Sequence, residues 1–293
     1  MSDHQPGILQ PLPAHATYLQ FDLQPESDRA EVVAALQRLQ TVVDGNHIVV
    51  GVGARLSTFL GANIEGLRDF SGIAESQVNL PSTPGALWIW LRDNERGTLV
   101  QQQRIVQQAL APALTLQQQV DAFKYADGRD LSGYEDGTEN PQDTHALAVA
   151  IDANGGSYVA VQQWLHHFDK LAAMSREAQD NMIGRRQSDN EELDDAPASA
   201  HVKRTAQEDF EPEAFVVRRS MPWSAGADAG FYFVAFATSF QAFEAQLRRM
   251  SGAEDGITDG LFQFTEPLTG AYFWCPPMKE AQLSLDWIPT SFV

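Results

Sequence analysis

The chain has 293 residues and a formal net charge of −19, with 43% hydrophobic and 20% charged residues, the composition of a globular protein with a substantial core. A chain this acidic cannot replace the counterions of a phosphate backbone and is repelled by anionic lipid. We therefore expect neither nucleic acid nor a membrane surface as a partner. The single cysteine excludes an intramolecular disulfide, and the first residues carry no basic, apolar signal sequence, so we expect a cytoplasmic protein.

The first half of the chain alternates between strand and helix patterns. Residues 18–23 alternate apolar and polar side chains and predict a strand, and Asp28 is placed to cap the helix that follows. Apolar runs predict two further strands, and a polar helix separates the second of these from a fourth strand. In chain order, the predicted elements are a strand over 18–23, a helix over 29–43, strands over 48–53 and 86–91, a helix over 97–110 and a strand over 117–125.

The second half repeats this plan. Residues 231–237 are the most hydrophobic of the predicted strands, and 240–250 has the spacing of an amphipathic helix that ends before Gly252. The other predicted elements are a strand over 158–164, a helix over 175–185, and extended segments over 200–204 and 215–218. Strand–helix–strand–strand–helix–strand, found twice, predicts an α+β protein with a duplicated ferredoxin-like fold. We expect two antiparallel sheets flanked by helices, one half in residues 1–145 and the other in 146–293.

One stretch, residues 133–141, has the unusual sequence Gly-Tyr-Glu-Asp-Gly-Thr-Glu-Asn-Pro. Its two glycines allow a sharp bend that presents the carboxylate of Asp136. Such a bend suits an ordinary turn, a metal loop or a catalytic acid–base group. The stretch lacks the ligand spacing of an EF-hand, which disfavours calcium. A second acidic stretch, residues 186–197, holds five carboxylates and is typical of a solvated surface loop.

Together with four other segments, this bend resembles the dye-decolorizing peroxidases, a family of haem-b enzymes with a duplicated ferredoxin-like fold. The resemblance covers nearly the whole chain and is closest to the short cytoplasmic branch, the B or P type. The other segments that carry it are Ile183-Gly184-Arg185, Ala200-His201-Val202, Val217-Arg218-Arg219-Ser220-Met221-Pro222 and Phe264-Thr265-Glu266-Pro267-Leu268-Thr269-Gly270.

The resemblance implies a peroxidase that reduces hydrogen peroxide and oxidises dyes, phenols or other small reductants through a ferryl intermediate. It implies one non-covalent haem b per chain, with His201 as the only protein ligand to iron. Asp259 matches the carboxylate that would accept a hydrogen bond from that imidazole. On the open face, Asp136 would carry a proton between the two peroxide oxygens, and Arg218 would supply fixed positive charge.

The resemblance implies further contacts to the cofactor. Arg185 and the backbone of Gly184 match the segment near the haem propionates. If residues 218–220 are extended, Ser220 returns to the same face as Arg218 and would lie near the distal water. Aromatic side chains would supply the apolar walls of the haem pocket, and the candidates are Phe231, Phe233 and Phe264.

Two other interpretations remain open from the sequence. One is a haem-binding or haem-handling protein of the same fold without peroxidase turnover. The other is a non-catalytic α+β binding module in which Asp136-Gly137 is only a turn. A Soret band in the purified protein would show haem binding and exclude the non-catalytic binding module. The apolar strands also predict a homo-oligomer, a dimer or a higher assembly.

Overall fold

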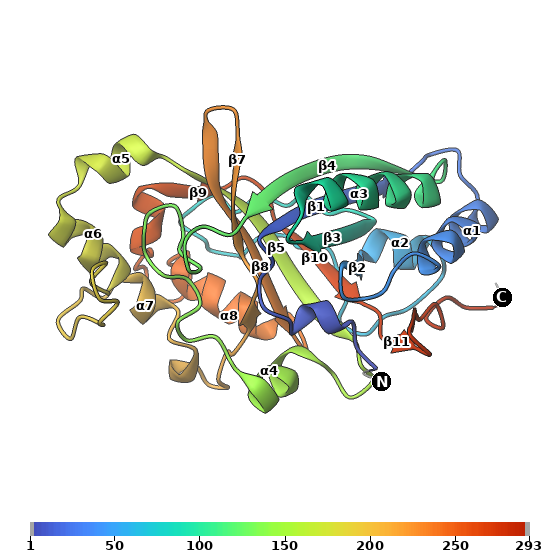
Figure 1. Cartoon of the computed structure of the whole chain (residues 1–293). Coiled ribbons are helices and arrows are strands. Elements are labelled where there is room, and N and C mark those ends of the chain that lie inside the picture. Colours follow the sequence, from blue (N-terminus) through green and yellow to red (C-terminus); the bar gives the residue numbers. More distant parts are fainter. Residues whose placement is uncertain (1–2, 291–293) are drawn as a thin grey trace.

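The computed structural model describes residues 3–290 (Figure 1). The first half follows the predicted order of elements. An Asp28 capping box starts its first helix, because the Asp28 side chain accepts from the N–H of Glu31 and the Glu31 side chain accepts from the N–H of Asp28. The elements are β1 (His15–Leu23), α1 (Arg29–Gln40), β2 (Ile48–Val52), α2 (Ala54–Phe59), β3 (Leu87–Asp93), α3 (Arg96–Leu110) and β4 (Leu114–Phe123). The strands pair antiparallel in the order β4-β1-β3-β2.

The second half has the same strand order, with more insertions. Its sheet runs β10-β5-β8-β7, and β6 and β9 add to β8 and β5. The strands are β5 (Ser157–His166), β6 (Val217–Arg218), β7 (Met221–Ala225), β8 (Asp228–Ala237), β9 (Thr265–Pro267) and β10 (Ala271–Cys275), followed by the short hairpin β11 (Met278–Lys279) and β12 (Gln282–Leu283). The helices are α4 (Asp143–Ala150), α5 (Phe168–Ala173), α6 (Arg176–Ile183), α7 (His201–Arg204) and α8 (Gln241–Met250), with 3₁₀ turns η1 (Pro6–Ile8), η2 (Gln207–Asp209) and η3 (Gly260–Gln263).

The two sheets confirm the predicted duplicated ferredoxin-like fold, and they also join at both edges. Ala122 of β4 pairs with Trp223 of β7, and Val52 of β2 pairs with Trp274 of β10. The joined sheets enclose a core rich in aromatic side chains, including Tyr18, Trp88, Trp90, Phe236 and Phe273. Because pairing runs continuously around this core, neither sheet leaves a long open edge. The boundary between halves at residue 145 stays a prediction.

One predicted element differs in kind. Residues 200–204, expected to be extended, form the short helix α7, which begins at His201. The carbonyl of Ala200 accepts hydrogen bonds from the N–H groups of Lys203 and Arg204. The guanidinium of Arg204 is buried and forms two hydrogen bonds with Asp255. Tertiary contacts therefore override the β-branched and charged pattern of this short segment.

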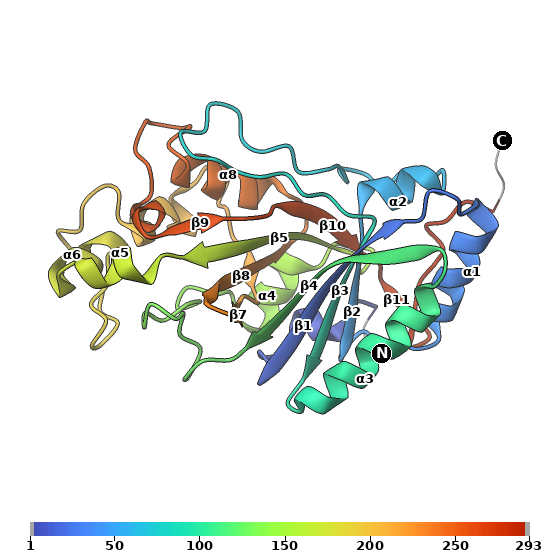
Figure 2. The same cartoon turned by 90° about the horizontal axis from the view of Figure 1, so that it is seen from above.

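The helices that matter for the site gather at one end of the molecule. Figure 1 shows α5, α6 and α7 at the end opposite α1 and α3, and Figure 2 shows α5 and α6 at that end from above. Helix α8 packs on the second sheet through Phe243 and Leu247, which share a buried cluster with Ala160 of β5 and Ala235 of β8. Within residues 3–290, no helix is long and apolar enough to cross a membrane.

Candidate active site

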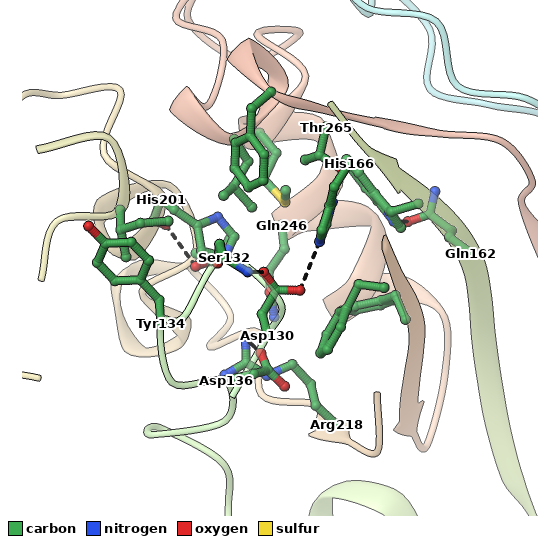
Figure 3. Close-up of a pocket in the computed structure, with 18 of the residues that line it drawn as sticks. Asp130, Ser132, Tyr134, Asp136, Gln162, His166, His201, Arg218, Gln246 and Thr265 are labelled. Carbon is green, nitrogen blue, oxygen red and sulfur yellow. Dashed lines mark hydrogen bonds and ion pairs between the residues drawn. The ribbon is translucent and has the colours of Figure 1, made fainter. Parts of the chain in front are cut away.

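The Gly-Tyr-Glu-Asp-Gly segment forms the predicted bend. Gly133 and Gly137 have φ angles of +90° and +79°, a region that costs glycine little and other residues more. The N–H of Asp136 donates to the carbonyl of Gly128 at 3.3 Å, which closes the bend. In Figure 3 the Asp136 carboxylate lies beside the guanidinium of Arg218. The bend therefore presents its acid to a cation from β6.

Asp136 and Arg218 form an ion pair that Asn140 holds in place. Oδ1 of Asp136 lies 3.7 Å from Nη1 of Arg218, and the two side chains are 25% and 16% exposed. Nδ2 of Asn140 donates to the carbonyl of Arg218 at 2.9 Å, and Oδ1 of Asn140 accepts from its N–H at 2.8 Å. The amide of the Thr-Glu-Asn-Pro extension thus fixes the backbone that carries Arg218. Sequence reasoning assigned Asn140 no role.

His201 is oriented by a buried carboxylate. Nδ1 of His201 lies 2.8 Å from Oδ2 of Asp259, whose side chain has no exposed surface. Oδ1 of Asp259 accepts a second hydrogen bond from the N–H of Leu261 at 2.8 Å. A carboxylate on Nδ1 assigns the proton to that nitrogen and leaves the lone pair on Nε2. Because Nδ1 faces the buried acid, Nε2 is the nitrogen that faces the cavity lined by this ring.

Gly184 brings α6 close to the start of α7. It ends α6 with a φ of +92°, and a Cβ here would lie 2.3 Å from Cγ2 of Val202. Its N–H donates to the carbonyl of Asp180, and its own carbonyl accepts from the N–H of Leu193. Both backbone groups of Gly184 are therefore engaged. The structure gives this glycine a packing role, and its contact to a cofactor stays a prediction.

The ion pair and the imidazole face the same cavity (Figure 3). It contains about 910 Å³ of space between atoms, part of it open to solvent. Its walls are mainly apolar and include the three predicted aromatic residues. The apolar lining comes chiefly from Phe231, Phe233, Phe243, Leu247, Met250 and Phe264. An adjoining hollow shares Asp136, His201 and Arg218 with the cavity.

Arg185 lies at the adjoining hollow and not in the main cavity. Its side chain is 13% exposed, and Nη2 contacts carboxylate oxygens of Glu139 at 3.1 Å and Glu192 at 2.9 Å. One of these acids belongs to the Thr-Glu-Asn-Pro extension and the other to the acidic loop. Arg185 thus joins two segments beside the cavity.

Ser220 does not line the cavity, which corrects the prediction for this residue. It is buried, and its Oγ accepts a hydrogen bond from the N–H of Val234 at 3.1 Å. The N–H of Arg219 donates to the carbonyl of the same Val234 at 2.8 Å. Residues 219 and 220 lie between β6 and β7, and the register with β8 is unchanged across them, since Arg218 pairs with Ala235 and Met221 pairs with Tyr232. The Oγ of Ser220 is engaged by the backbone of β8, and the residue does not join Arg218 at the cavity.

A polar network that sequence reasoning missed lines another part of the wall. Nε2 of His166 lies 2.8 Å from Oδ1 of Asp130, and Nδ1 lies 2.7 Å from Oγ1 of Thr265 (Figure 3). The hydroxyl of Thr265 donates its hydrogen bond to the carbonyl of Leu165, so Oγ1 can only accept from Nδ1 of His166. The sequence placed His166 just after the strand predicted over 158–164 and gave no signal for its partners, which lie 36 and 99 residues away.

The charge state of this network follows from the same contacts. Burial opposes ionisation of Asp130, but hydrogen bonds from His166 and Ser132, with the charge of His166, lower the pKa of Asp130 overall. An ionised Asp130 accepts from Nε2, while Thr265 accepts from Nδ1. Both ring nitrogens of His166 therefore have acceptors, and the histidine and the acid form a buried pair in the wall.

The comparisons with known proteins agree with this geometry. A family model described as "Dyp-type peroxidase, C-terminal" matches residues 127–280. A dye-decolorizing peroxidase of Rhodococcus erythropolis is 31% identical over 291 residues, which is 92% of this chain and 85% of that protein. The chain belongs to the Dyp-type peroxidase family. Another such peroxidase, from Mycolicibacterium paratuberculosis, is 33% identical over 74% of this chain and 65% of its own length.

Solved structures of Dyp-type proteins share the whole architecture. The dye-decolorizing protein from V. cholerae has a TM-score of 0.83 at 30% identity and covers 92% of this chain and 96% of its own. A DypB variant from Rhodococcus jostii RHA1, solved in complex with heme, has a TM-score of 0.81 at 31% identity, with 92% and 94% coverage. The duplicated fold is therefore that of the Dyp-type family, and the site described above lies within the segment that the family model matches.

Proposed function

We propose that this protein is a haem-b peroxidase that binds one haem per chain without a covalent bond, reduces hydrogen peroxide, and oxidises dyes, phenols or other small donors. The observation that carries the proposal is the shared cavity. An imidazole nitrogen faces it from α7, and an acid–arginine pair faces it from the bend and β6. Membership of the Dyp-type family and the heme complex of a DypB relative support the same function.

The residues present fit a haem. The cavity has aromatic and aliphatic walls for the faces of a porphyrin, among which Phe233 is our candidate for direct contact. His201 offers a nitrogen lone pair, and Asp259 increases its basicity by accepting from Nδ1. Nε2 of Gln162, which lines the cavity, is buried without a hydrogen-bond partner. An unpaired buried donor is costly and indicates that a polar group of a ligand reaches this wall. At the rim, Arg185 is our candidate for a propionate.

The chain's own groups would then divide the work. A bound haem would supply the redox chemistry, since it can store the two oxidising equivalents of peroxide and release them one at a time. His201 would hold the iron through Nε2. The Asp136 carboxylate takes the proton from one oxygen of peroxide and returns it to the other, which leaves as water. The guanidinium of Arg218, 3.7 Å from the acid, stabilises negative charge that develops on the departing oxygen.

Haem loading tests the assignment of the ligand. We expect His201→Ala to lose most of its affinity for hemin, measured by Soret absorbance during titration of the haem-free protein. His167→Ala is the matched control, since that imidazole pairs with Glu266 at the surface and does not line the cavity. A normal histidine-ligated spectrum in His201→Ala would remove His201 from the proposal. Wild-type protein that refuses hemin would remove the function itself.

We also propose a homo-oligomer, a dimer or higher assembly, in the cytoplasm. Exposed apolar side chains such as Val100 and Ile105 on α3 support association. A single buried cysteine, Cys275, is compatible with a reducing compartment. Light scattering tests the assembly, and a mass of one 32.3 kDa chain at micromolar concentration would contradict it.

A further inference from the structure

The bend that carries Asp136 is closed by its own backbone hydrogen bonds. The N–H of Asp130 donates to the carbonyl of Tyr134 at 2.9 Å, and the N–H of Asp136 donates to the carbonyl of Gly128 at 3.3 Å. Residues 128–136 therefore form a compact segment, which we call the Asp136 hairpin. The place of the Asp136 carboxylate then depends on the groups outside the hairpin that hold it.

Asp130 makes a buried link between this hairpin and the second sheet. Its Oδ2 accepts from the N–H of Ser132 at 2.7 Å, which fixes the carboxylate relative to the hairpin. Its Oδ1 lies 2.8 Å from Nε2 of His166, the last residue of β5. The side chains of His166 and Asp130 are only 4% and 16% exposed, so solvent screens their contact little. One carboxylate thus bonds the hairpin with one oxygen and the sheet with the other.

The ring of His166 is itself held firmly by the sheet. Its Nδ1 lies 2.7 Å from Oγ1 of Thr265, and β9 pairs with β5 so that these two residues lie opposite each other. The centroids of Phe168 and Phe264 lie 5.8 Å and 5.1 Å from that of the imidazole. Because both nitrogens are bonded and two rings pack around it, the imidazole is a fixed point to which Asp130 attaches the hairpin.

Apart from the ion pair of Asp136 itself, the other side-chain hydrogen bonds from the hairpin to the rest of the described chain go to α6 and the loop after it. The hydroxyl of Tyr134 donates to Asp180 of α6. Gln187 and Asn190 of the acidic loop donate to the hairpin at 2.8 Å and 2.9 Å. Much of that loop is exposed, and exposed loops move more than strands do. His166 is therefore the strand residue that ties down the hairpin independently of Asp136.

We propose that His166 and Asp130 are positioning residues for the Asp136 carboxylate, which they hold in its place beside Arg218 through the hairpin. The inference rests on the proposed function, in which Asp136 carries the proton of peroxide. The pair acts through the bend and not on peroxide itself, although both side chains line the cavity. Misplacement of a reacting group by about 1 Å can cost about 100-fold in rate. The fixed imidazole on β5 thus sets how well the carboxylate performs its proton transfer.

Two substitutions at one position test the link. His166→Leu removes both hydrogen bonds of the ring, whereas His166→Gln places an amide N–H near the position of Nε2 and can still donate to Asp130. We expect His166→Leu to slow the reaction of the haem-loaded protein with peroxide by about 10–100-fold, measured by stopped-flow absorbance. His166→Gln should recover most of this loss. Thr265→Val, which removes only the hydroxyl behind Nδ1, should give a smaller loss in the same direction.

Two controls separate positioning from a general loss of stability. His167→Leu removes the neighbouring imidazole, which pairs with Glu266 at the surface. Leu39→Ala opens a cavity in the buried core of the first sheet and lowers stability without touching the hairpin. Both controls should react with peroxide at the wild-type rate. A loss in Leu39→Ala as large as that in His166→Leu would overturn the proposal.

A double-mutant cycle shows whether His166 acts through Asp136. If it does, His166→Leu should slow the reaction little further once Asp136→Asn has removed the carboxylate. Losses that multiply in full would mean that His166 acts by another route, and they would contradict the proposal.

Hydrogen exchange tests the link without any turnover. In the full chain, with and without haem, the amides of residues 130–136 should exchange at least about tenfold faster in His166→Leu than in wild type or in either control. Wild-type exchange in His166→Leu together with a wild-type rate would overturn the proposal. If haem-loaded wild-type protein does not react with peroxide, the proposed function has failed, and the exchange rates still decide whether His166 holds the hairpin.

Discussion

The bond between Asp259 and His201 offers a sharp test, because one atom decides which imidazole nitrogen is free. In Asp259→Asn the amide oxygen can still accept from the N–H of Leu261, as Oδ1 of the acid does at 2.8 Å. Its NH₂ group then replaces the oxygen that lies 2.8 Å from Nδ1 of His201. A donor at this position favours the tautomer with the proton on Nε2, which removes the lone pair from the cavity side. The flipped amide instead places its NH₂ against the N–H of Leu261.

Either amide orientation loses one buried hydrogen bond. An unsatisfied buried donor costs about 1–3 kcal/mol. Loss of a partner to a metal-bound histidine typically lowers metal affinity about 10–100-fold, and this range corresponds to about 1.4–2.7 kcal/mol. We therefore expect Asp259→Asn to weaken hemin binding by one to two orders of magnitude, measured by Soret titration of the haem-free protein.

A control separates ligation from folding. Glu254→Gln removes an acid from the same region, but one that is partly exposed and pairs with Arg249. It should leave hemin affinity unchanged, and thermal unfolding of both haem-free variants measures any loss of stability. Wild-type hemin affinity and an unaltered spectrum in Asp259→Asn would refute the argument that this carboxylate sets the tautomer of His201.

Three further predictions concern the rest of the cavity. Asp136→Asn should slow the reaction with peroxide by about 100-fold or more, because an amide cannot carry the proton. Arg218→Leu should slow it by a similar factor, because the developing negative charge is no longer stabilised. Stopped-flow absorbance measures both rates, and an unchanged rate would show that the substituted residue has no role in this step. Asn140→Ala removes two hydrogen bonds to the backbone of Arg218 and should lower the free energy of unfolding by about 1–3 kcal/mol, while hemin affinity stays the same. The pKa of Asp130 is lower in the folded protein than in the unfolded chain. The ionised carboxylate therefore stabilises the fold at pH values above its unfolded-state pKa of about 3.9, and this stabilisation is lost as the pH falls through the folded-state pKa. Asp130→Asn should therefore destabilise the protein at pH 7 and flatten the acid limb of urea-unfolding stability, and an acid limb identical to wild type would contradict this.

The sequence by itself determined the repeated strand–helix order and the bend at Asp136. Both depend on local rules, namely two-residue alternation in strands and the freedom of glycine at positive φ, as at Gly133 and Gly137. The family resemblance added His201, Asp259 and Arg218. In the structure His201 and Arg218 line one cavity, and Asp259 contacts Nδ1 of His201.

Only the tertiary structure decided how these groups meet. The hydrogen bond from the N–H of Val234 to Oγ of Ser220 holds this side chain against β8, so alternation alone misplaced Ser220. The pairing of His166 with Asp130 and Thr265 joins three segments far apart in the chain. The contact of Trp164 with Phe262 spans 98 positions of sequence and has no local signature. Hydrogen bonds and ring contacts of this kind depend on distances in space, and no periodicity along the chain encodes them.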